Sequence, residues 1–313
     1  MKIITLIPIK NEDWILEQTL ENVCSFSDHV IIADQQSTDR SLEICKKFDK
    51  VRVVINNSEG HSNSVRWALL DEARKIEGNN FIFCIDADEI ISPKFIGEIK
   101  TLISNNILFP GMGVSFQWIQ IWGSMKTHRV DGVWRNNIKV AGFYDDRMID
   151  YKREFVINDH TSRIPQVSKI LHIAKYPLLH IQSISYERYI VKQAWYRCNE
   201  LIASPTQVKK INHKYSVSNT DKLQIEDINE EWLNGVSVDT LEYSEEKDWR
   251  YVEILSRFDK YGITFFEPLQ IWDIKKLHDM FVEKTGRKPK AKTFFKVIVI
   301  INNLKNLIIN FKI

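Results

Sequence analysis

Residues 81–89 read FIFCIDADE, and this stretch decides the fold class. Its first five residues are apolar, as is typical of a buried strand. Asp86 and Asp88 follow at once, so two carboxylates stand where that strand ends. Hard divalent cations prefer oxygen ligands and often bind one or two carboxylates together with substrate phosphates. The stretch therefore predicts a Mn²⁺ or Mg²⁺ site at a strand end. The alternative is that Asp88 and Glu89 cap the next helix.

Upstream of this stretch, apolar runs at 3–9, 29–33 and 51–55 predict three more strands, each followed by a segment of helical periodicity. Ser92-Pro93 begins another helix, because proline suits the first helical position. Strands that alternate with helices form βαβ units and a parallel sheet. We therefore expect an α/β fold whose ligands bind beyond the carboxyl ends of the strands.

The chain changes character after residue 105. Residues 106–180 are rich in aromatic and β-branched side chains with glycines between them, which favours mixed strands and long loops. Residues 185–204 return to helical periodicity, and residues 205–283 are polar with spaced aromatics, which favours helices.

The overall charge excludes one class of protein. The chain has 313 residues with 43 Lys+Arg and 41 Asp+Glu, a formal net charge of +2. A generally basic nucleic-acid binder is therefore not expected, and no nucleic-acid partner is assigned. The four cysteines form no CxxC pair, which argues against a zinc site. Cys24, Cys45 and Cys84 lie within apolar periodic segments, which favours buried free thiols in a reducing cytosol.

The charge is unevenly distributed along the chain. From Lys284 onward there are eight basic residues and no acidic one, so residues 1–283 carry −6. Apolar residues recur every three or four positions from Phe294 to Phe311, which predicts a basic amphipathic helix. We expect residues 290–313 to contact an anionic membrane; packing on the body or a dimer contact is the alternative. No run approaches the ~20 apolar residues of a membrane span. The expected location is cytoplasmic, with peripheral attachment to the inner face of the plasma membrane.

Four segments, in this order, resemble the family 2 inverting glycosyltransferases of GT-A fold: residues 7–12 (IPIKNE), 33–39 (ADQQSTD), 60–66 and 83–89. The resemblance covers about the first 105 residues. Gln36 departs from it, because the family usually has glycine there. No Gln-x-x-Arg-Trp motif occurs, which argues against a processive polysaccharide synthase.

The resemblance implies a metal-dependent enzyme. It would transfer a sugar from a nucleotide-diphosphate donor, with UDP expected, to a hydroxyl of a surface glycan or lipid-linked acceptor, with inversion. It also implies donor-site residues from several segments. These are Pro8, Glu12 and Asp34 at the base and ribose, Arg66 at the nucleotide or its diphosphate, Asp86 and Ala87 at the ribose or a metal-bound water, and Asp88, Asp86 and His180 at the metal.

An inverting enzyme needs a base that takes the acceptor hydroxyl proton. Residues 143–148 and 155–160 resemble a subgroup that adds sugars to lipopolysaccharide cores, in which an acidic residue or a His-Glu pair follows an arginine-bearing strand. The glutamate of that pair is missing here. Asp159 is the first candidate for the base, and Asp145, Asp146 and His160 are the alternatives.

The expected organisation has four parts. They are a nucleotide-sugar-binding half of a GT-A domain at 1–105, an acceptor-binding half at 106–204, a helical region at 205–283 and a basic tail at 284–313. Two other functions compete with glycosyl transfer. A sugar nucleotidyltransferase would need a glycine-rich opening loop that ends in arginine, which is absent. A non-catalytic glycan-binding scaffold would keep the fold without needing both Asp86 and Asp88.

Overall fold

The computed structural model describes residues 1–57, 64–151, 162–216, 223–236 and 248–290. The chain divides into two compact units. The first comprises Met1–Ile184 and Gln224–Glu242, and the second comprises Ser185–Leu223 and Tyr243–Ile313. Each unit has its own apolar core.

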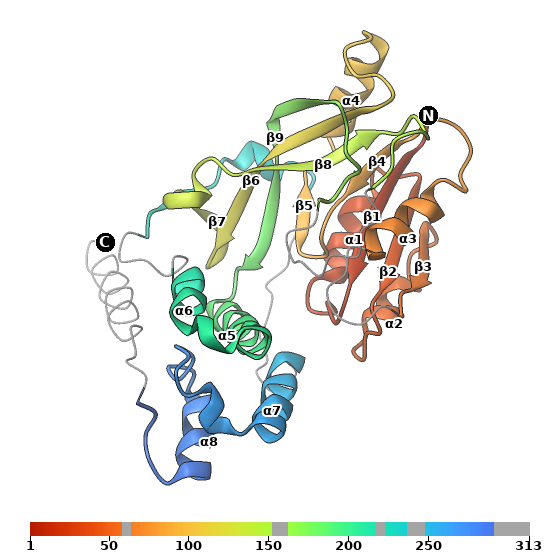
Figure 1. Ribbon diagram of the computed structural model, residues 1–313. Helices are drawn as coiled ribbons and strands as arrows, with labels where there is room; N and C mark the ends of the chain where they lie inside the picture. The colour runs from red at the N-terminus through yellow and green to blue at the C-terminus, as the bar shows by residue number, and fades with distance from the viewer. Residues whose placement is uncertain (58–63, 152–161, 217–222, 237–247, 291–313) are drawn as a thin grey trace. The chain divides into compact units, whose positions relative to one another are not determined.

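The first unit opens with a parallel sheet of order β4-β1-β2-β3 (Figure 1). Its strands are β1 (Ile3–Ile9), β2 (His29–Asp34), β3 (Val51–Ile55) and β4 (Phe81–Cys84). The helices between these strands are α1 (Leu16–Cys24), α2 (Ser41–Cys45) and α3 (Ser64–Ala73). The predicted βα alternation is therefore confirmed.

Strand β1 is central because both of its faces are buried. Ile3 and Ile7 belong to a core cluster that includes Leu20 of α1. Ile4 belongs to a second cluster that includes Leu69 of α3. Helices thus cover both faces of β1, which explains why its sequence is an almost continuous apolar run.

The parallel strands are followed by helix α4 (Phe95–Ser104) and by a set of mixed strands. These are β5 (Glu89–Ile91), β6 (Met112–Trp122), β7 (Ser124–Arg129), β8 (Ile138–Tyr144), β9 (Lys169–Ser183) and β10 (Ile225–Asp227), with short 3₁₀ turns at Gly132–Trp134 and Glu230–Leu233. Strand β8 joins β4 to β6 in antiparallel fashion, and β9 pairs in parallel with β6 and antiparallel with β5. The expectation of mixed strands after residue 105 is confirmed. The capping alternative for Asp88 and Glu89 is wrong, because Glu89 begins β5.

The second unit is helical. Its elements are α5 (Tyr186–Ala203), α6 (Val208–Ser216), α7 (Trp249–Tyr261) and α8 (Lys275–Thr285), with short 3₁₀ turns at Pro205–Gln207 and Ile263–Phe266. Trp195 and Cys198 of α5 share a core with Ile254 and Phe258 of α7. By its contacts α5 belongs with these helices, whereas the sequence division at residue 204 groups it with the acceptor half. The functional division into four parts stays a prediction.

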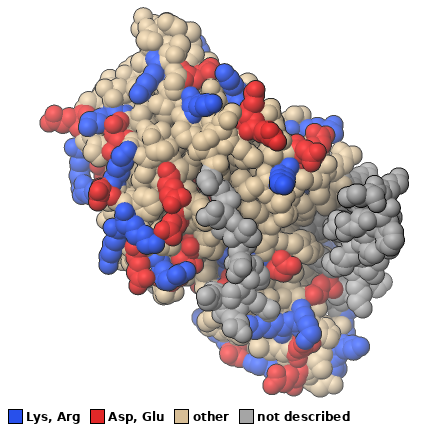
Figure 2. All heavy atoms as spheres, turned by 180° about the vertical axis from the view of Figure 1, so that it is seen from behind, with Lys and Arg blue, Asp and Glu red and all other residues tan. Residues whose placement is uncertain are grey.

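No helix in the described parts of the chain combines the length and apolar character needed to cross a bilayer. The amphipathic helix expected within residues 290–313 lies almost wholly outside the described residues. Basic and acidic side chains are interspersed on the face displayed in Figure 2. Such mixing agrees with the near-neutral total charge.

Candidate active site

The carboxyl ends of three strands bring the predicted polar residues to one edge of the sheet. Ile9 at the end of β1 is paired with Asp34 at the end of β2. Cys84 at the end of β4 is paired with Leu6 of β1, so the turn after β4 emerges at the same edge. Ligands of parallel α/β sheets bind at such an edge, which makes it the candidate active site.

Hydrogen bonds fasten the loops after β1 and β2 to each other. The buried Asp34 carboxylate accepts from the Ser37 backbone N–H at 3.2 and 3.3 Å. The Asn11 backbone N–H donates to Ser37 Oγ at 2.9 Å, and the Asn11 side chain accepts from the Thr38 backbone N–H at 2.7 Å. These bonds fix the orientation of the Asp34 carboxylate at the edge.

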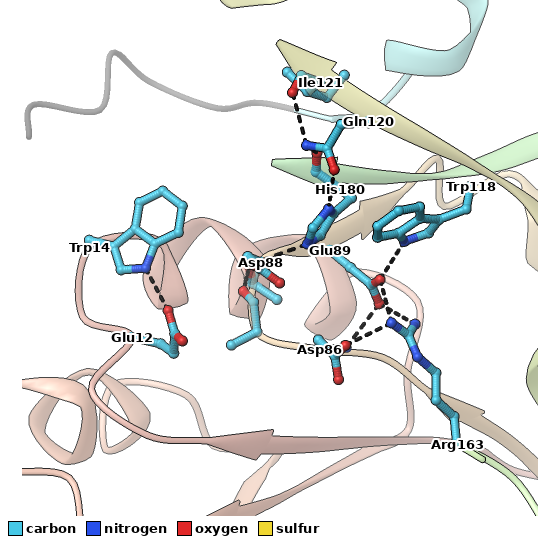
Figure 3. A network of polar contacts seen from close by, with 12 residues as sticks. Glu12, Trp14, Asp86, Asp88, Glu89, Trp118, Gln120, Ile121, Arg163 and His180 are labelled. Atoms are coloured by element: carbon cyan, nitrogen blue, oxygen red, sulfur yellow. Dashed lines mark hydrogen bonds and ion pairs between the residues drawn. The ribbon is translucent and has the colours of Figure 1, made fainter. Parts of the chain in front are cut away.

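Two further donor-side candidates also lie at this edge. Pro8 is in β1 beside Ala33, and Glu12 follows the strand. The Glu12 carboxylate accepts from the indole N–H of Trp14 at 2.5 Å, as Figure 3 shows. The roles of Pro8, Glu12 and Asp34 in binding base and ribose stay predictions.

Asp86 is held by two arginines. Arg66 Nη2 donates to Oδ1 and Arg163 Nη2 donates to Oδ2, both at 2.7 Å. Partial burial would raise the pKa of the Asp86 carboxyl, but Arg163 and Arg66 outweigh that effect and hold this pKa below its ordinary value. The carboxylate therefore stays ionised and orients both guanidinium groups. Arg66 Nη1 is buried and has no hydrogen-bond partner within the described parts of the chain, so it is a donor available to a ligand.

Glu89 is fully buried and completes this charged cluster. Its carboxylate accepts from Arg163 Nη1 at 2.6 Å, from Arg163 Nη2 at 2.8 Å and from the Trp118 indole N–H at 2.6 Å. The Asp86 backbone N–H also donates to it at 2.9 Å. Charge-assisted bonds of this kind are among the strongest polar contacts in a protein. Sequence reasoning assigned no site role to Glu89, Arg163 or Trp118. Only Glu89 could have been suspected from the sequence, because it directly follows the two aspartates.

Asp88 meets His180 because β5 pairs with β9. The register sets Glu89 opposite His180, and the Ile181 backbone N–H donates to the Asp88 carbonyl at 2.8 Å. Asp88 Oδ2 and His180 Nε2 are then 3.4 Å apart, and both side chains are buried (Figure 3). Ala87 between the two aspartates is buried and its carbonyl accepts from Thr19 Oγ1 at 2.6 Å.

The protein side chains at this site suit a cation that is also coordinated by the substrate. Among the described residues no group of three or more His, Cys, Asp or Glu side chains is placed to hold a metal. Asp88 and His180 face each other, whereas both oxygens of Asp86 accept from arginines. Two protein ligands leave coordination positions for phosphate oxygens and water, as is usual for metals that bind nucleotide phosphates.

One further cation lies close to this cluster. The Lys139 ammonium of β8 is 4.9 Å from the centroid of the Trp118 ring. Burial and the nearby Arg163 lower the pKa of Lys139 below its ordinary value, because both disfavour its charged form. An incoming anion would relieve that penalty.

Two of the candidate bases lie elsewhere. Strand β8 runs antiparallel to β4 and sets Tyr144 opposite Phe81, which begins β4, so Asp145 and Asp146 follow at the amino edge of the parallel strands. This edge is opposite to the carboxyl edge at which Asp86 lies. The Asp145 carboxylate accepts from Arg74 at 2.8 and 3.1 Å, and Asp146 accepts from two backbone N–H groups of its own turn. These contacts hold the chain after β8 in place, and we do not retain Asp145 or Asp146 as candidate bases.

The other two candidates, Asp159 and His160, lie outside the described residues. The residues on either side of that segment are joined, since Tyr151 Oη donates to the Arg163 carbonyl at 2.7 Å. Through its side chain, Arg163 contacts Asp86 and Glu89. The described residue Arg163, which follows that segment in the chain, is therefore part of the candidate site.

The part of the chain that carries this site matches a known protein family. Residues 5–148 match the family model described as glycosyl transferase family 2. They form a family 2 glycosyltransferase domain. The match covers β1 to β8 and includes the two aspartates after β4. The predicted GT-A fold class is confirmed.

Curated relatives match the same domain. An uncharacterized glycosyltransferase of Rickettsia typhi is 29% identical over 105 residues, 34% of this chain and 34% of its own. An uncharacterized glycosyltransferase of Rickettsia bellii is 30% identical over 104 residues, 33% of each chain. This chain thus spans about a third of the length of these curated relatives.

Some solved structures are similar to the chain at low sequence identity. S. aureus TarS 1–349 is 14% identical with a TM-score of 0.43, over 92% of each chain. Glucosyl-3-phosphoglycerate synthase from Mycobacterium tuberculosis, solved with Mn²⁺, UDP-glucose and phosphoglyceric acid, is 20% identical with a TM-score of 0.28, over 38% of this chain and 44% of that chain.

Proposed function

We propose that the protein is a metal-dependent glycosyltransferase. It moves a sugar from a UDP-linked donor to a hydroxyl of a surface-glycan or lipid-linked acceptor, with inversion. The observation that supports this proposal most strongly is the Asp88–His180 pair, 3.4 Å apart at the carboxyl edge of a family 2 domain. The surface-glycan acceptor rests on the sequence resemblance to enzymes of lipopolysaccharide cores.

Asp88 and His180 would hold the divalent cation. When bound, such a cation neutralises the charge that develops on the departing diphosphate. A carboxylate suits Mg²⁺ and Mn²⁺ alike, but Mg²⁺ favours sites made only of oxygen ligands. The imidazole therefore favours Mn²⁺ over Mg²⁺ in this site.

The arginines and Lys139 would receive the donor phosphates. Asp86 aligns Arg66 and leaves Arg66 Nη1 as a buried donor for a diphosphate oxygen. Lys139 adds a second positive charge beside Trp118. Fixed donors in a partly buried site stabilise a leaving group more than water does, because they need no reorganisation.

Asp159 is the proposed base. It would accept the proton of the acceptor hydroxyl as that oxygen attacks the anomeric carbon. Asp159 is four residues from Arg163, which contacts Asp86. The proposal for Asp159 rests on the sequence resemblance and on this closeness along the chain to Arg163.

Release of UDP from a panel of UDP-sugars in the presence of Mn²⁺ tests the proposal. The wild type should release UDP in a metal-dependent way. Asp88→Ala should lose at least about 100-fold of that turnover, in the range found when one main electrostatic stabiliser is removed. Asp49→Ala is the matched control, because Asp49 is an exposed carboxylate of the same unit. Equal turnover by wild type and Asp88→Ala would overturn the proposed metal role, and absence of turnover and of Mn²⁺-dependent UDP binding would favour the scaffold alternative.

A further inference from the structure

We infer that Gln120 is a positioning residue that fixes the tautomer and orientation of His180 and so leaves Nε2 as the atom that binds a cation. The cation-binding part of this inference rests on the proposed function, whereas the tautomer of His180 does not depend on it. Gln120 lies on β6 opposite His180 of the parallel strand β9, and both side chains are buried. His180 Nδ1 and Gln120 Oε1 are 2.7 Å apart (Figure 3).

The hydrogen bonds of Gln120 decide which way its amide points. Its Nε2 lies 3.1 Å from the Ile121 carbonyl and 3.3 Å from the His180 carbonyl. A carbonyl only accepts, so the amide nitrogen must occupy that side and the amide oxygen must face the imidazole. The reversed amide would set an oxygen against two carbonyl oxygens.

The tautomer of His180 follows from that orientation. An amide oxygen has no proton to give, so the hydrogen of the 2.7 Å contact belongs to His180 Nδ1. In a neutral imidazole the other nitrogen then carries a lone pair. Metal-binding histidines are commonly fixed in this way by an acceptor on the nitrogen that does not bind the metal.

The lone pair of Nε2 is directed at a carboxylate. His180 Nε2 and Asp88 Oδ2 are 3.4 Å apart, and in this tautomer both atoms are acceptors. The ring is also fixed in its plane, because Trp118 stacks on it with a centroid separation of 4.3 Å and an interplanar angle of 27°. Two acceptors held face to face attract a cation between them. The opposite tautomer would donate from Nε2 to Asp88 and compete with that cation.

The experiment combines two readouts on the full chain. Imidazole ¹⁵N spectra of the metal-free protein, with the His180 signals assigned from a His180→Gln sample, report the tautomer. Mn²⁺ titration in the presence of UDP reports the affinity. The wild type should show the proton on Nδ1. Gln120→Met, which keeps the volume but removes the acceptor, should move it to Nε2 and weaken Mn²⁺ binding on the order of 10–100-fold.

Two variants control for general disruption of the strand. Gln120→Glu keeps an acceptor for Nδ1 and should retain the wild-type tautomer and Mn²⁺ affinity within a few-fold. Gln117→Leu changes another glutamine of β6 and should leave both readouts unchanged. An unshifted tautomer in Gln120→Met would overturn the positioning role. A shifted tautomer with unchanged Mn²⁺ affinity would overturn the cation-binding role of Nε2. Failure of the wild type to bind Mn²⁺ would overturn the proposed function instead, and the tautomer readout would still test Gln120.

Discussion

Gln36 occupies the left-handed region of backbone space, with φ of 60°. It follows directly on the Asp34-Gln35 corner, where the resembled family usually has glycine. The left-handed conformation costs a residue that has a Cβ atom roughly 1–2 kcal/mol, whereas glycine adopts it freely. The loop thus has the left-handed backbone conformation that favours glycine, although glutamine occupies the position.

Gln36→Gly should therefore raise the free energy of unfolding by about 0.5–1 kcal/mol, since relief of strain exceeds the roughly 0.5–1 kcal/mol of added unfolded-state entropy. Urea denaturation measures this change. Gln35→Gly is the matched control, because Gln35 is not among the described residues with positive φ, and this change should lower stability. If both glycines destabilise equally, the strain argument is incorrect.

Helix α1 positions the turn that carries the two aspartates. Its Thr19 hydroxyl donates to the Ala87 carbonyl at 2.6 Å. One helical turn later, the Asn22 amide donates to the Ile91 carbonyl at 2.9 Å and accepts from the Ile91 N–H at 3.2 Å. These bonds hold both ends of the segment from Ala87 to Ile91, so Asp88 depends on a helix that contains no predicted site residue.

Asn22→Ala should lower the free energy of unfolding by about 2–3 kcal/mol, because it leaves a buried N–H and a buried C=O of β5 without their partner. Thermal or urea unfolding checks this value. Glu21→Ala alters an exposed position of the same helix and should change stability by less than about 0.5 kcal/mol. A loss in Asn22→Ala no larger than in Glu21→Ala would show that α1 does not support the turn.

The first four strands and the position of Asp86 and Asp88 could be predicted from sequence because local apolar runs and turn residues specify them. The pairing of β5 with β9 could not, because Glu89 and His180 are far apart in sequence and local periodicity carries no register between distant strands. Arg163 was missed for the same reason, since its contacts with Asp86 and Glu89 join residues that are far apart in sequence. Asp145 was misplaced because its sequence does not reveal that β8 runs antiparallel to β4.

Both units contain buried thiols. The sequence predicts buried thiols at Cys24, Cys45 and Cys84. Burial is confirmed for Cys45 and Cys84, whereas Cys24 is only half-buried, and Cys198 is buried as well. Burial is the main effect that raises the pKa of each buried thiol to about 12. At pH 8 only about 1 in 10,000 of such thiols is ionised, and the thiolate is the reactive form.

Iodoacetamide at pH 8 should therefore modify only Cys24 at an appreciable rate in the native protein, as counted by mass spectrometry. All four cysteines should react in denaturant. The sign of the pH effect also follows: a raised thiol pKa stabilises the fold below about pH 9, and this contribution is lost as the pH rises towards 12. Rapid native labelling of Cys84 would contradict the assigned burial.

The basic tail predicts that the protein binds to anionic membranes. Full-length protein should sediment with vesicles that contain anionic lipids and should dissociate as salt increases. Changing Lys290, Lys292 and Lys296 to Gln should weaken this binding on the order of 100-fold, at about 1 kcal/mol per basic residue. The control changes the exposed Lys2, Lys46 and Lys47 to Gln, which removes the same number of positive charges from outside the tail. Equal sedimentation of the two triple variants would argue against a membrane role for residues 290–313.

We propose that Asp88 and His180 share one divalent cation with the donor diphosphate. Anomalous diffraction from crystals soaked with Mn²⁺ and UDP locates that ion directly. We expect a single strong peak within coordination distance of Asp88 Oδ2 and His180 Nε2, with a UDP phosphate oxygen beside it and the Arg66 guanidinium facing the diphosphate. UDP bound with no Mn²⁺ peak at this pair, or a peak held by other residues, would contradict the account.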